Sequence, residues 1–502
     1  MKLALLSVTD KTGLITLAMA LAPHYRLLST GGTYETLLHA GLPVQRVEDI
    51  TGVEELFNGR VKTLHPVIHG GILYERTNAH HLEEAQKHAI APIDLVVVNL
   101  YRFQDTLAAS PHDEEAIIEA IDIGGPALIR SAAKNHAHVT VLTDPMQYSA
   151  FINVMDAKGE VPFSFKRQCA AVAFEHTAQY DQAIADHFAD LKHEDSFSLE
   201  ALGKRPLRYG ENPDQVASVY TTQPDVPYSM LSAQMHHGKA LSYNNYLDGD
   251  AALSLLAEFE KPTVVAIKHT NPCGVGQAPT LLEAWHKAYT ADPVSIFGGI
   301  VAFNRVVDAR VAQALNEHFL EVILAPSYTE DALKILTQKK NIRVLTYLEG
   351  TRTSTTHLRT IRGGLLVQED ATQTPRFDVV TKLAPSESEM EDILFAQAVV
   401  KHVKSNAVVL VNDGQTVGIG AGQMNRVGAA NIAFAQAGEK ARGAVLASDG
   451  FFPLPDTVEA AIKAGIKTIV QPGGSLKDDL SIKACDDGNI AMVFNHQRTF
   501  KH

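Results

Sequence analysis

The sequence predicts an α/β protein in which a doubly wound parallel sheet domain is followed by a duplicated α/β domain. Three observations support this fold class: short apolar runs alternate with helical patterns over residues 1–150, a polar stretch follows residue 190, and the rest of the chain contains a long internal echo. At 502 residues, the chain is also too long for one ordinary core. We expect a boundary near residue 195, which gives domains of 1–195 and 196–502.

The N-terminal region alternates two kinds of pattern. Short apolar runs predict strands at 2–8, 26–29, 95–100 and 139–142. Helix-like spacing of apolar residues lies between them, at 12–22, 34–40 and 114–121. Alternation of this kind is typical of a mostly parallel sheet covered by helices.

The C-terminal region repeats its own pattern. The apolar run 264–267 and the glycines at 274 and 276 are matched by the run 407–410 and the glycines at 418 and 420. Two further pairs follow in the same order, 295–299 with 449–453 and 322–326 with 468–472. Short apolar strings can also match by chance, but the kept order favours a duplicated unit whose copies face each other.

Composition limits the classes of function. A formal net charge of -13 argues against a nucleic-acid or anionic-membrane surface. Three cysteines without a CxxC pair fit a reducing compartment and give no cysteine cluster for a metal. Asp10 and Lys11 interrupt the apolar N-terminus, and no run approaches the length of a membrane span. We expect a cytoplasmic protein.

Two N-terminal loops have the composition of an anion site. Residues 7–13, Ser-Val-Thr-Asp-Lys-Thr-Gly, and 28–33, Leu-Ser-Thr-Gly-Gly-Thr, each follow a predicted strand and open a predicted helix. Hydroxyls, glycines and helix N-terminal N–H groups can hold a phosphate there, although Ser and Thr also serve as ordinary helix caps. Neither loop is a Walker A or GxGxxG sequence, so neither has the signature of an ATP or NAD site.

Lys268 and His269 stand side by side where an apolar strand, 263–267, meets a turn marked by Asn-Pro and by the glycines at 274 and 276. Strand ends of open α/β sheets usually carry the chemistry, and a neighbouring cation can keep an imidazole neutral as a proton acceptor. The alternative is a hydrogen-bonded turn with a solvated lysine. Other charged groups, at 60, 62, 122 and 134, are individually more typical of a solvated surface.

Taken together, the motifs resemble a known family. They occur in the following order: SVTDKTGL, STGGT, GRVKTLHP, NLY, DIGGP, AAKN, RYGENP, KHTNPCG, FGGIVAFN, SNAVV, GIGAGQ, SDGFF and a closing arginine. This is the order found in the bifunctional purine biosynthesis enzymes, which join an IMP cyclohydrolase to an aminoimidazole carboxamide ribonucleotide (AICAR) transformylase. The resemblance runs from residue 1 to residue 502.

The resemblance implies that domain 1–195 has a methylglyoxal-synthase-like fold and closes formyl-AICAR to IMP with loss of water. It places the 5′-phosphate on Ser7, Lys11, Ser29, Thr30 and Gly31. Around the base it places Arg60, Lys62, Thr63, Tyr101, Asp122 and Lys134. We expect Asp122 and Tyr101 to handle protons and Lys62 and Lys134 to stabilise the oxyanion.

The resemblance implies that domain 196–502 is a duplicated cytidine-deaminase-like fold that transfers a formyl group from 10-formyltetrahydrofolate to AICAR. His269 would take a proton, while Lys268 would stabilise the oxyanion or assist the leaving N10. The positions that match AICAR-binding residues are Arg208, Asn245, Asn406, Arg426 and Arg498. Those that match folate-binding residues are Phe297, Gly298, Glu321 and Phe451.

The zinc signature of the deaminases is absent, so we expect chemistry without a metal. The family also implies a homodimer whose transformylase site is built from both chains. Its small-molecule partners would be AICAR, formyl-AICAR, IMP and a reduced folate, with no nucleic acid and no membrane.

The chain departs from the family pattern at a few positions, and the loss of an aromatic at 454 and of a cation at 455 puts folate affinity or tail preference in doubt. The departures are Arg102, Asp214, Gly450, Leu454 and Pro455. Two alternatives stay open: an enzyme that retains only one of the two activities, and a non-catalytic protein that binds purine nucleotides.

Overall fold

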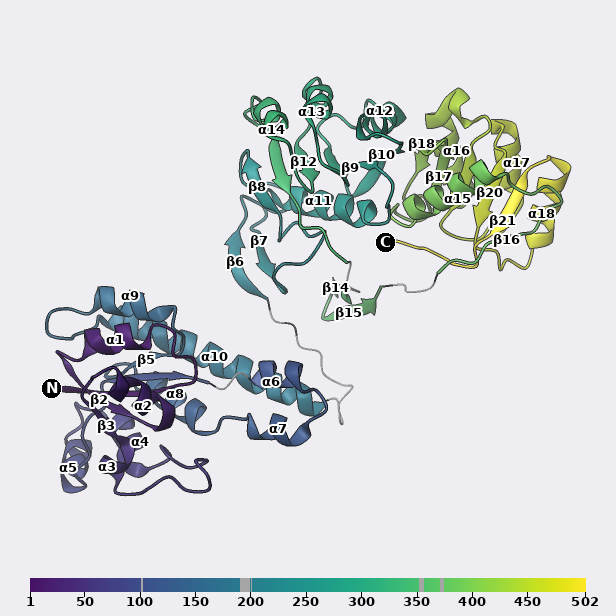
Figure 1. The fold of residues 1–502 in the computed structure, drawn as a ribbon. Helices are drawn as coiled ribbons and strands as arrows, with labels where there is room; N and C mark the ends of the chain where they lie inside the picture. The colour runs from purple at the N-terminus through teal and green to yellow at the C-terminus, as the bar shows by residue number, and fades with distance from the viewer. Residues whose placement is uncertain (101–102, 190–198, 200, 352–355, 371–373) are drawn as a thin grey trace. The chain divides into compact units, whose positions relative to one another are not determined.

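The structure is a computed structural model that describes residues 1–100, 103–189, 199, 201–351, 356–370 and 374–502 (Figure 1). It divides into two compact units, which we call unit 1, Met1–Ser198, and unit 2, Leu199–His502. Among the described residues, no helix combines the length and apolar character needed to cross a membrane. The three cysteines are buried free thiols.

Unit 1 contains a five-stranded sheet whose strands are all parallel, in the order β3-β2-β1-β4-β5. The strands are β1 Lys2–Val8, β2 Tyr25–Ser29, β3 Val44–Arg46, β4 Leu95–Asn99 and β5 Thr140–Leu142. The predicted parallel sheet is therefore confirmed. β3 was not predicted, because this three-residue edge strand has two polar residues and no apolar run.

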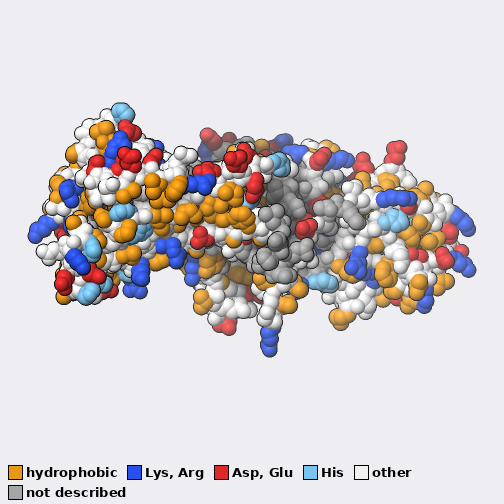
Figure 2. Space-filling model, turned by 90° about the horizontal axis from the view of Figure 1, so that it is seen from below, with side chains coloured by type: hydrophobic (Ala, Val, Ile, Leu, Met, Phe, Trp, Pro, Cys, Tyr) orange, Lys and Arg blue, Asp and Glu red, His pale blue; other side chains and the backbone are white. Residues whose placement is uncertain are grey.

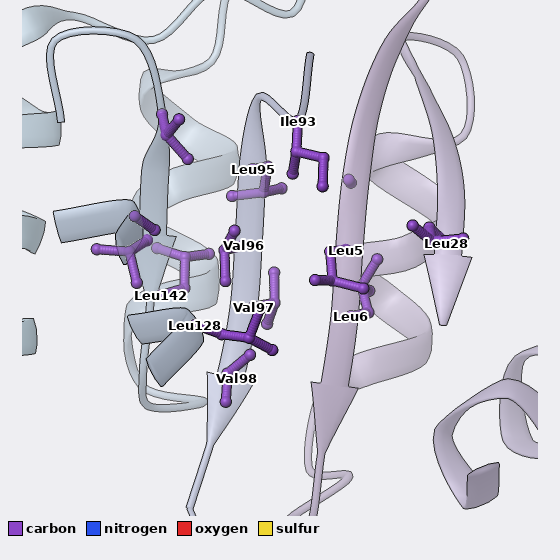
Figure 3. Packing of buried hydrophobic residues seen from close by; sticks show 14 of the residues in the cluster. Leu5, Leu6, Leu28, Ile93, Leu95, Val96, Val97, Val98, Leu128 and Leu142 are labelled. Carbon is purple, nitrogen blue, oxygen red and sulfur yellow. The ribbon is translucent and has the colours of Figure 1, made fainter. Parts of the chain in front are cut away.

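Ten helices are described in unit 1. They are α1 Leu14–Leu21, α2 Gly31–His39, α3 Val47–Thr51, α4 Pro66–Leu73, α5 Ala79–Lys87, α6 Phe103–Ala109, α7 Glu114–Glu119, α8 Gly124–Lys134, α9 Gln147–Val154 and α10 Phe163–Ala189. Apolar side chains of β1 and β4, such as Leu5 and Val97, form the core with Leu128 of α8 (Figure 3). Because the strand centres supply this core, the loops at their ends are free to carry polar groups.

Unit 2 contains two copies of one unit, each a helix, a β-hairpin and three further helix–strand pairs, which confirms the duplicated α/β fold. The first copy comprises α11 Tyr243–Leu256, β9 Thr263–Lys268, β10 Asn271–Gln277, α12 Leu281–Ala291, β11 Ile300–Phe303, α13 Ala309–Asn316, β12 Val322–Ala325, α14 Glu330–Leu336 and β13 Arg343–Thr346. The second comprises α15 Glu387–Val400, β17 Val408–Asn412, β18 Gln415–Gly420, α16 Arg426–Ala437, β19 Val445–Ser448, α17 Asp456–Ala464, β20 Thr468–Gln471, α18 Asp478–Asp487 and β21 Ala491–Phe494. A short 3-10 helix, η1, spans Gly438–Ala441.

The two copies share one twelve-stranded sheet, in the order β16-β21-β20-β19-β17-β18-β10-β9-β11-β12-β13-β8. They meet where β10 pairs antiparallel with β18, so they join edge to edge and the expectation that they face each other was wrong. Pairing in one sheet satisfies the backbone groups that two separate edges would expose. Helices α11 and α15 then contribute to one apolar cluster that contains strand residues of both copies.

The repeated glycines have a packing role. Gly276 lies inside β10, where a Cβ atom would stand 2.4 Å from the carbonyl oxygen of Ala284 in α12. Gly420 lies inside β18, where a Cβ atom would stand 1.8 Å from the carbonyl oxygen of Ala429 in α16. The glycines thus allow close approach of strand and helix, and the turn that we predicted at 274 and 276 is wrong.

Four shorter strands form two hairpins outside the large sheet, and two lie at its edges. The hairpins are β6 Leu202–Pro206 with β7 Ser218–Thr221, and β14 Thr356–Ile361 with β15 Gly364–Glu369. The edge strands are β8 Gln234–His237 and β16 Asp378–Val379. Nearly every residue of β14 and β15 is exposed, which leaves apolar side chains such as Leu366 in solvent.

The Glu389 carboxylate should make unit 2 less stable in acid. It accepts hydrogen bonds from the backbone N–H of Ser386, at 2.7 Å, and from Thr468, at 2.9 Å, and thereby ties α15 to β20. Burial raises its pKa, but these hydrogen bonds and the charge of Lys467 outweigh burial and lower the pKa from 4.5 to about 2. The carboxylate therefore stabilises the fold above pH 4.5, and this contribution is lost as the pH falls towards 2. Glu389→Gln should lower the urea midpoint at pH 7 and have progressively less effect in acid.

The measurement is urea unfolding followed by the fluorescence of Trp285, the single tryptophan of the chain, which is buried in unit 2. Glu391→Gln in the same helix is the matched control. Its carboxylate is exposed and pairs with Lys261 at 3.4 Å, so it should change little at either pH. An equal loss of stability for Glu389→Gln at pH 7 and pH 3 would contradict the assignment.

Candidate functional site

A cavity of about 800 Å³ opens in unit 1 at the carboxyl ends of β1, β2 and β4. Ligands of open α/β sheets bind at this edge. The cavity wall comes from residues 7–11, 30–33, 58–64, 98–99 and 118–128. It brings together eight of the predicted site residues: Ser7, Lys11, Thr30, Gly31, Arg60, Lys62, Thr63 and Asp122.

One end of this cavity is suited to an anion. The hydroxyls of Ser7 and Thr30 lie 3.1 Å apart, and α2 begins at the next residue, Gly31. The Lys62 Nζ is 3.6 Å from the point where a Cβ atom of Gly31 would stand, and the Lys11 Nζ is 3.8 Å from the equivalent point at the following glycine. Two ammonium groups and a helix N-terminus therefore converge on one place.

Asn99 shapes this anion loop, although the sequence indicated only that it ends a buried strand. Its side-chain oxygen accepts the backbone N–H groups of Thr9, at 2.6 Å, and Asp10, at 3.0 Å. Its Nδ2 donates to the carbonyl of Asp10 at 3.0 Å. An asparagine at the carboxyl end of a parallel strand is the signal that could have indicated this role.

The Asp122 carboxyl group is the candidate proton acceptor in the cavity. One oxygen accepts the backbone N–H of Gly125 at 2.8 Å. Burial raises the pKa of Asp122, while hydrogen bonds from the backbone of Gly125 and Gly124 act in the opposite direction. A higher pKa makes the ionised carboxylate a stronger base.

Two carboxylates pair with two cations of the cavity, and no sequence pattern indicated either of them. Lys62 pairs with Glu55 at 2.9 Å, and Arg60 forms an ion pair with Glu119. Both pairs are largely exposed, so an incoming anion can displace the carboxylates at little cost.

Three predicted residues are not placed at the cavity. Ser29 is buried, and its hydroxyl donates to the carbonyl of Leu6 at 2.7 Å. Lys134 is exposed at the last residue of α8, at the other end of that helix from Gly124. Tyr101 lies outside the described residues. The roles of all three stay predictions.

In unit 2, Lys268 ends β9 and His269 begins the two-residue turn to β10. His269 and Thr270 have φ angles of 51° and 61°, as a type I′ hairpin turn requires. The Asp248 carboxylate accepts the backbone N–H of Thr270 at 2.7 Å. The turn is thus fixed with the imidazole at the strand end, as the sequence predicts.

The residues around Lys268 form a first cluster. Its Nζ donates to the carbonyl of Phe297. Gly298 is next in the chain, and the backbone N–H of Glu321 donates to the carbonyl of Gly299 at 3.0 Å. The structure thereby brings together Lys268, Phe297, Gly298 and Glu321, which were predicted from three separate places in the sequence.

Arg426 organises a second cluster. Its guanidinium donates to Asn406 Oδ1 at 2.7 Å, to the carbonyl of Phe451 at 3.2 Å, to Ser448 Oγ at 2.9 Å and to Asp449. The Arg426 side chain is 6% exposed and that of Asp449 is 0% exposed. These bonds use most of the five N–H groups of the arginine and hold Asn406 in place, while AICAR binding by Arg426 stays a prediction.

The two clusters lie close to each other at strand ends of the large sheet, where β9 ends and β17 begins. The backbone N–H of Lys404, two residues before Asn406, donates to Asn271 Oδ1 at 3.0 Å, directly after the turn that holds His269. Strand ends from the two repeated units of this chain therefore meet here.

The remaining predicted residues of unit 2 make local contacts. The oxygen of Asn245 accepts the backbone N–H of Ser242 at 3.1 Å in the capping box of α11. Arg208 lies over the ring of Tyr209, at 5.5 Å, and Arg498 over the ring of Phe500, at 4.7 Å. Substrate binding by these three residues stays a prediction.

Comparison with known proteins gives a consistent result. A family model described as AICARFT/IMPCHase bienzyme matches residues 132–436, and one described as MGS-like domain matches residues 13–127. The chain belongs to the AICARFT/IMPCHase bienzyme family. It is 51% identical over 507 residues to the bifunctional purine biosynthesis protein PurH of Anoxybacillus flavithermus, with 99% of each chain covered. It is 49% identical over 509 residues to that of Bacillus subtilis, covering 100% of this chain and 99% of the relative.

The family assignment confirms the resemblance carried by the motifs and the α/β fold class of both units. In the described part of the chain, no group of three or more His, Cys, Asp or Glu residues could hold a metal ion. The Arg426–Asp449 pair is a buried feature of this bienzyme that the motif order did not indicate.

Asp449→Asn should reduce AICAR formyl transfer by about tenfold or more, because it leaves the Arg426 guanidinium buried without its countercharge and loosens Asn406. IMP formation from formyl-AICAR should be unchanged, since that cavity lies within unit 1. Steady-state rates of both reactions are the measurement. Asp413→Asn, which removes a carboxylate that is 91% exposed, is the control. A folded Asp449→Asn variant with full formyl transfer would contradict the positioning role.

Proposed function

We propose that this chain catalyses two consecutive steps of purine biosynthesis. Unit 2 would transfer a formyl group from 10-formyltetrahydrofolate to AICAR, and unit 1 would close the product to IMP. The observation that supports this proposal is that each unit has a candidate proton acceptor and a cation in one place, either lining one cavity or adjacent at one strand end. These are Asp122 with Lys62 in one unit and His269 with Lys268 in the other.

The ring closure begins when the carboxamide nitrogen of formyl-AICAR attacks the formyl carbon. A neutral amide is a poor nucleophile, so Asp122 takes its proton as the C–N bond forms. The formyl oxygen becomes an alkoxide, which the ammonium of Lys62 stabilises. The alkoxide then takes the proton held by Asp122, and the hydroxyl leaves as water together with the proton of the formamide nitrogen as the C=N bond of the new ring forms. The hydroxyls and ammonium groups around Gly31 hold the 5′-phosphate.

The formyl transfer begins when the 5-amino group of AICAR attacks the formyl carbon of the folate. This amine is conjugated with the ring and is therefore weakly nucleophilic. His269 takes the proton that the amine loses, and Lys268 stabilises the oxyanion of the tetrahedral intermediate. The bond to N10 then breaks as N10 takes up the proton that His269 holds, which gives tetrahydrofolate.

The substrates would divide between the two clusters of unit 2. Phe297 and Phe451 are 64% and 40% exposed, so both offer an aromatic face to a flat pterin ring. Asn406, held by Arg426, offers its amide to AICAR. The buried free thiols of the chain fit a reducing compartment such as the cytoplasm.

We also propose that the working form is a homodimer. The β14–β15 hairpin is exposed on both faces and carries Leu365, Leu366 and Val367, yet an isolated two-stranded hairpin is only marginally stable in water. The β6 strand beside the predicted substrate residue Arg208 is likewise exposed throughout. Figure 2 shows further hydrophobic side chains gathered on the surface at the left, where unit 1 lies. A second chain of this protein would cover such surfaces and complete the formyl transfer site.

Lys62→Ala should abolish IMP formation from formyl-AICAR and leave formyl transfer intact, because it removes the oxyanion cation of unit 1 alone. His269→Ala should do the reverse. A coupled assay that supplies AICAR and 10-formyltetrahydrofolate, and follows tetrahydrofolate and IMP separately, measures both reactions in one sample. Arg26→Ala, at an exposed position of β2, is the control for each.

The same assay distinguishes the alternatives. Release of tetrahydrofolate without IMP, or conversion of supplied formyl-AICAR without formyl transfer, would mean that one activity is silent. Binding of IMP with neither reaction would leave a nucleotide-binding protein. Loss of both activities in a folded Lys62→Ala variant would count against separate sites.

Dilution should remove formyl transfer before it removes cyclisation, because only the transformylase site is proposed to need both chains of the dimer. Rates of the two reactions, measured across enzyme concentrations that span the sedimentation-derived dissociation constant, test this. Parallel loss of both activities, or formyl transfer by the monomer, would be inconsistent with a shared site.

A further inference from the structure

Tyr180 makes a contact that the proposed chemistry of unit 1 does not yet use. Its hydroxyl accepts the backbone N–H of Asp122 at 2.7 Å and donates to the carbonyl of Ala120 at 3.2 Å. One side chain of α10 thereby bridges the peptide groups on both sides of Ile121. The contact spans 58 residues of sequence, so no local pattern would have indicated it.

The bridged segment is part of the cavity wall. Residues 120–123 connect α7 to α8, and Ile121 to Gly125 all line the cavity. Within this segment the Asp122 carboxyl caps α8 through the N–H of Gly125. A Cβ atom at Gly125 would stand 2.4 Å from Asp122 Oδ2, so the carboxyl group lies tightly against the helix start. Its position therefore depends on where the peptide of Asp122 is held.

The Tyr180 ring is itself held firmly. The first half of α10 is anchored by the buried residues Cys169, Ala170, Ala173 and Thr177. The ring of Tyr180 lies edge-on to that of Phe103, with centroids 6.4 Å apart, and Phe103 is 1% exposed. Burial is the main reason that the pKa of Tyr180 is raised, so its hydroxyl keeps the proton that it donates to Ala120.

We propose that Tyr180 is a positioning residue for the ring closure: its hydroxyl fixes the peptide of Asp122 and so aims the carboxyl group at the carboxamide nitrogen. This inference rests on the proposed role of Asp122. The competing explanation is that the bridge only stabilises unit 1, in which case its loss would lower the amount of folded enzyme without altering the enzyme that remains.

Tyr180→Phe separates these explanations, because it keeps the ring against Phe103 and removes only the hydroxyl. The expected result is a kcat for IMP formation that falls about tenfold, with KM for formyl-AICAR changed less than about threefold, since a small misplacement of a reacting group is costly. Formyl transfer by the same full-length protein should be unchanged, since that site lies in unit 2.

Tyr148→Phe is the matched control. Tyr148 is also buried in unit 1, and its hydroxyl has no hydrogen-bond partner among the residues that the structure describes. This variant should keep wild-type rates of both reactions.

The pH profile of kcat is the decisive measurement. IMP formation should decline in acid as Asp122 becomes protonated. In Tyr180→Phe the loosened segment admits water, which lowers the pKa of Asp122 towards its ordinary value, so the acid limb should move to lower pH. A lower rate with an unmoved acid limb, or a loss that Tyr148→Phe matches, would overturn the positioning role.

Asp122→Asn keeps an oxygen for the Gly125 N–H and removes the proton acceptor. If Asp122→Asn loses cyclisation while Tyr180→Phe behaves as Tyr148→Phe does, the proposed function stands and the role of Tyr180 falls. If Asp122→Asn retains full cyclisation, the proposed role of Asp122 is wrong and the inference falls with it.

Discussion

The antiparallel seam between β10 and β18 determines the arrangement of unit 2. It is short: Gly276 pairs with Gln415, the N–H of Val275 donates to Thr416 Oγ1 at 2.9 Å, and that of Gln277 donates to Gly414 at 2.8 Å. Strands β10 and β18 run in opposite directions across this seam. The end of β9 and the start of β17 therefore lie side by side, on the same side of the sheet where strands begin and end. This is why Lys268 and His269, from one copy, come close to Asn406, from the other. The glycines of both strands permit the seam, since each lets a helix pack directly on the backbone.

Unit 1 depends on a different constraint, which is the balance of charge in its cavity. The whole chain carries a net charge of -13, yet its cavity collects Lys11, Arg60 and Lys62. Glu55 and Glu119 neutralise two of these cations through exposed pairs. Such pairs contribute little to stability, so the carboxylates yield readily to a phosphate or an alkoxide. The protein thus keeps a basic site in an acidic surface without an uncompensated cluster of cations.

The sequence predicted most of what local patterns can encode. The apolar runs of β1 and β4 and the strand before Lys268 were visible, because burial requires continuous apolar residues. The two anion loops were visible because their hydroxyls and glycines stand close together in sequence. Contacts between distant segments were not visible: the Arg426–Asp449 pair, the Asn99 bonds to the loop and the Tyr180 bridge each join residues more than 20 positions apart. The glycines at 274 and 276 were misjudged for the same reason, since the helix backbone that requires them belongs to another element.

The two proposed proton acceptors differ in kind, and the chemistry accounts for the difference. An amide N–H is so weakly acidic that its proton must leave while the new bond forms, so the acceptor has to be held at the nitrogen throughout, with a cation at the oxyanion. An amine can attack first and then lose its proton as an acidic ammonium, for which a neutral imidazole is sufficient. Asp122 sits in a half-buried wall that is fixed by backbone hydrogen bonds, as the first case requires. His269 is exposed on a tight turn at a strand end, where an imidazole can reach a bound substrate. In the proposed roles, each acceptor is therefore held in the way that its own nucleophile requires.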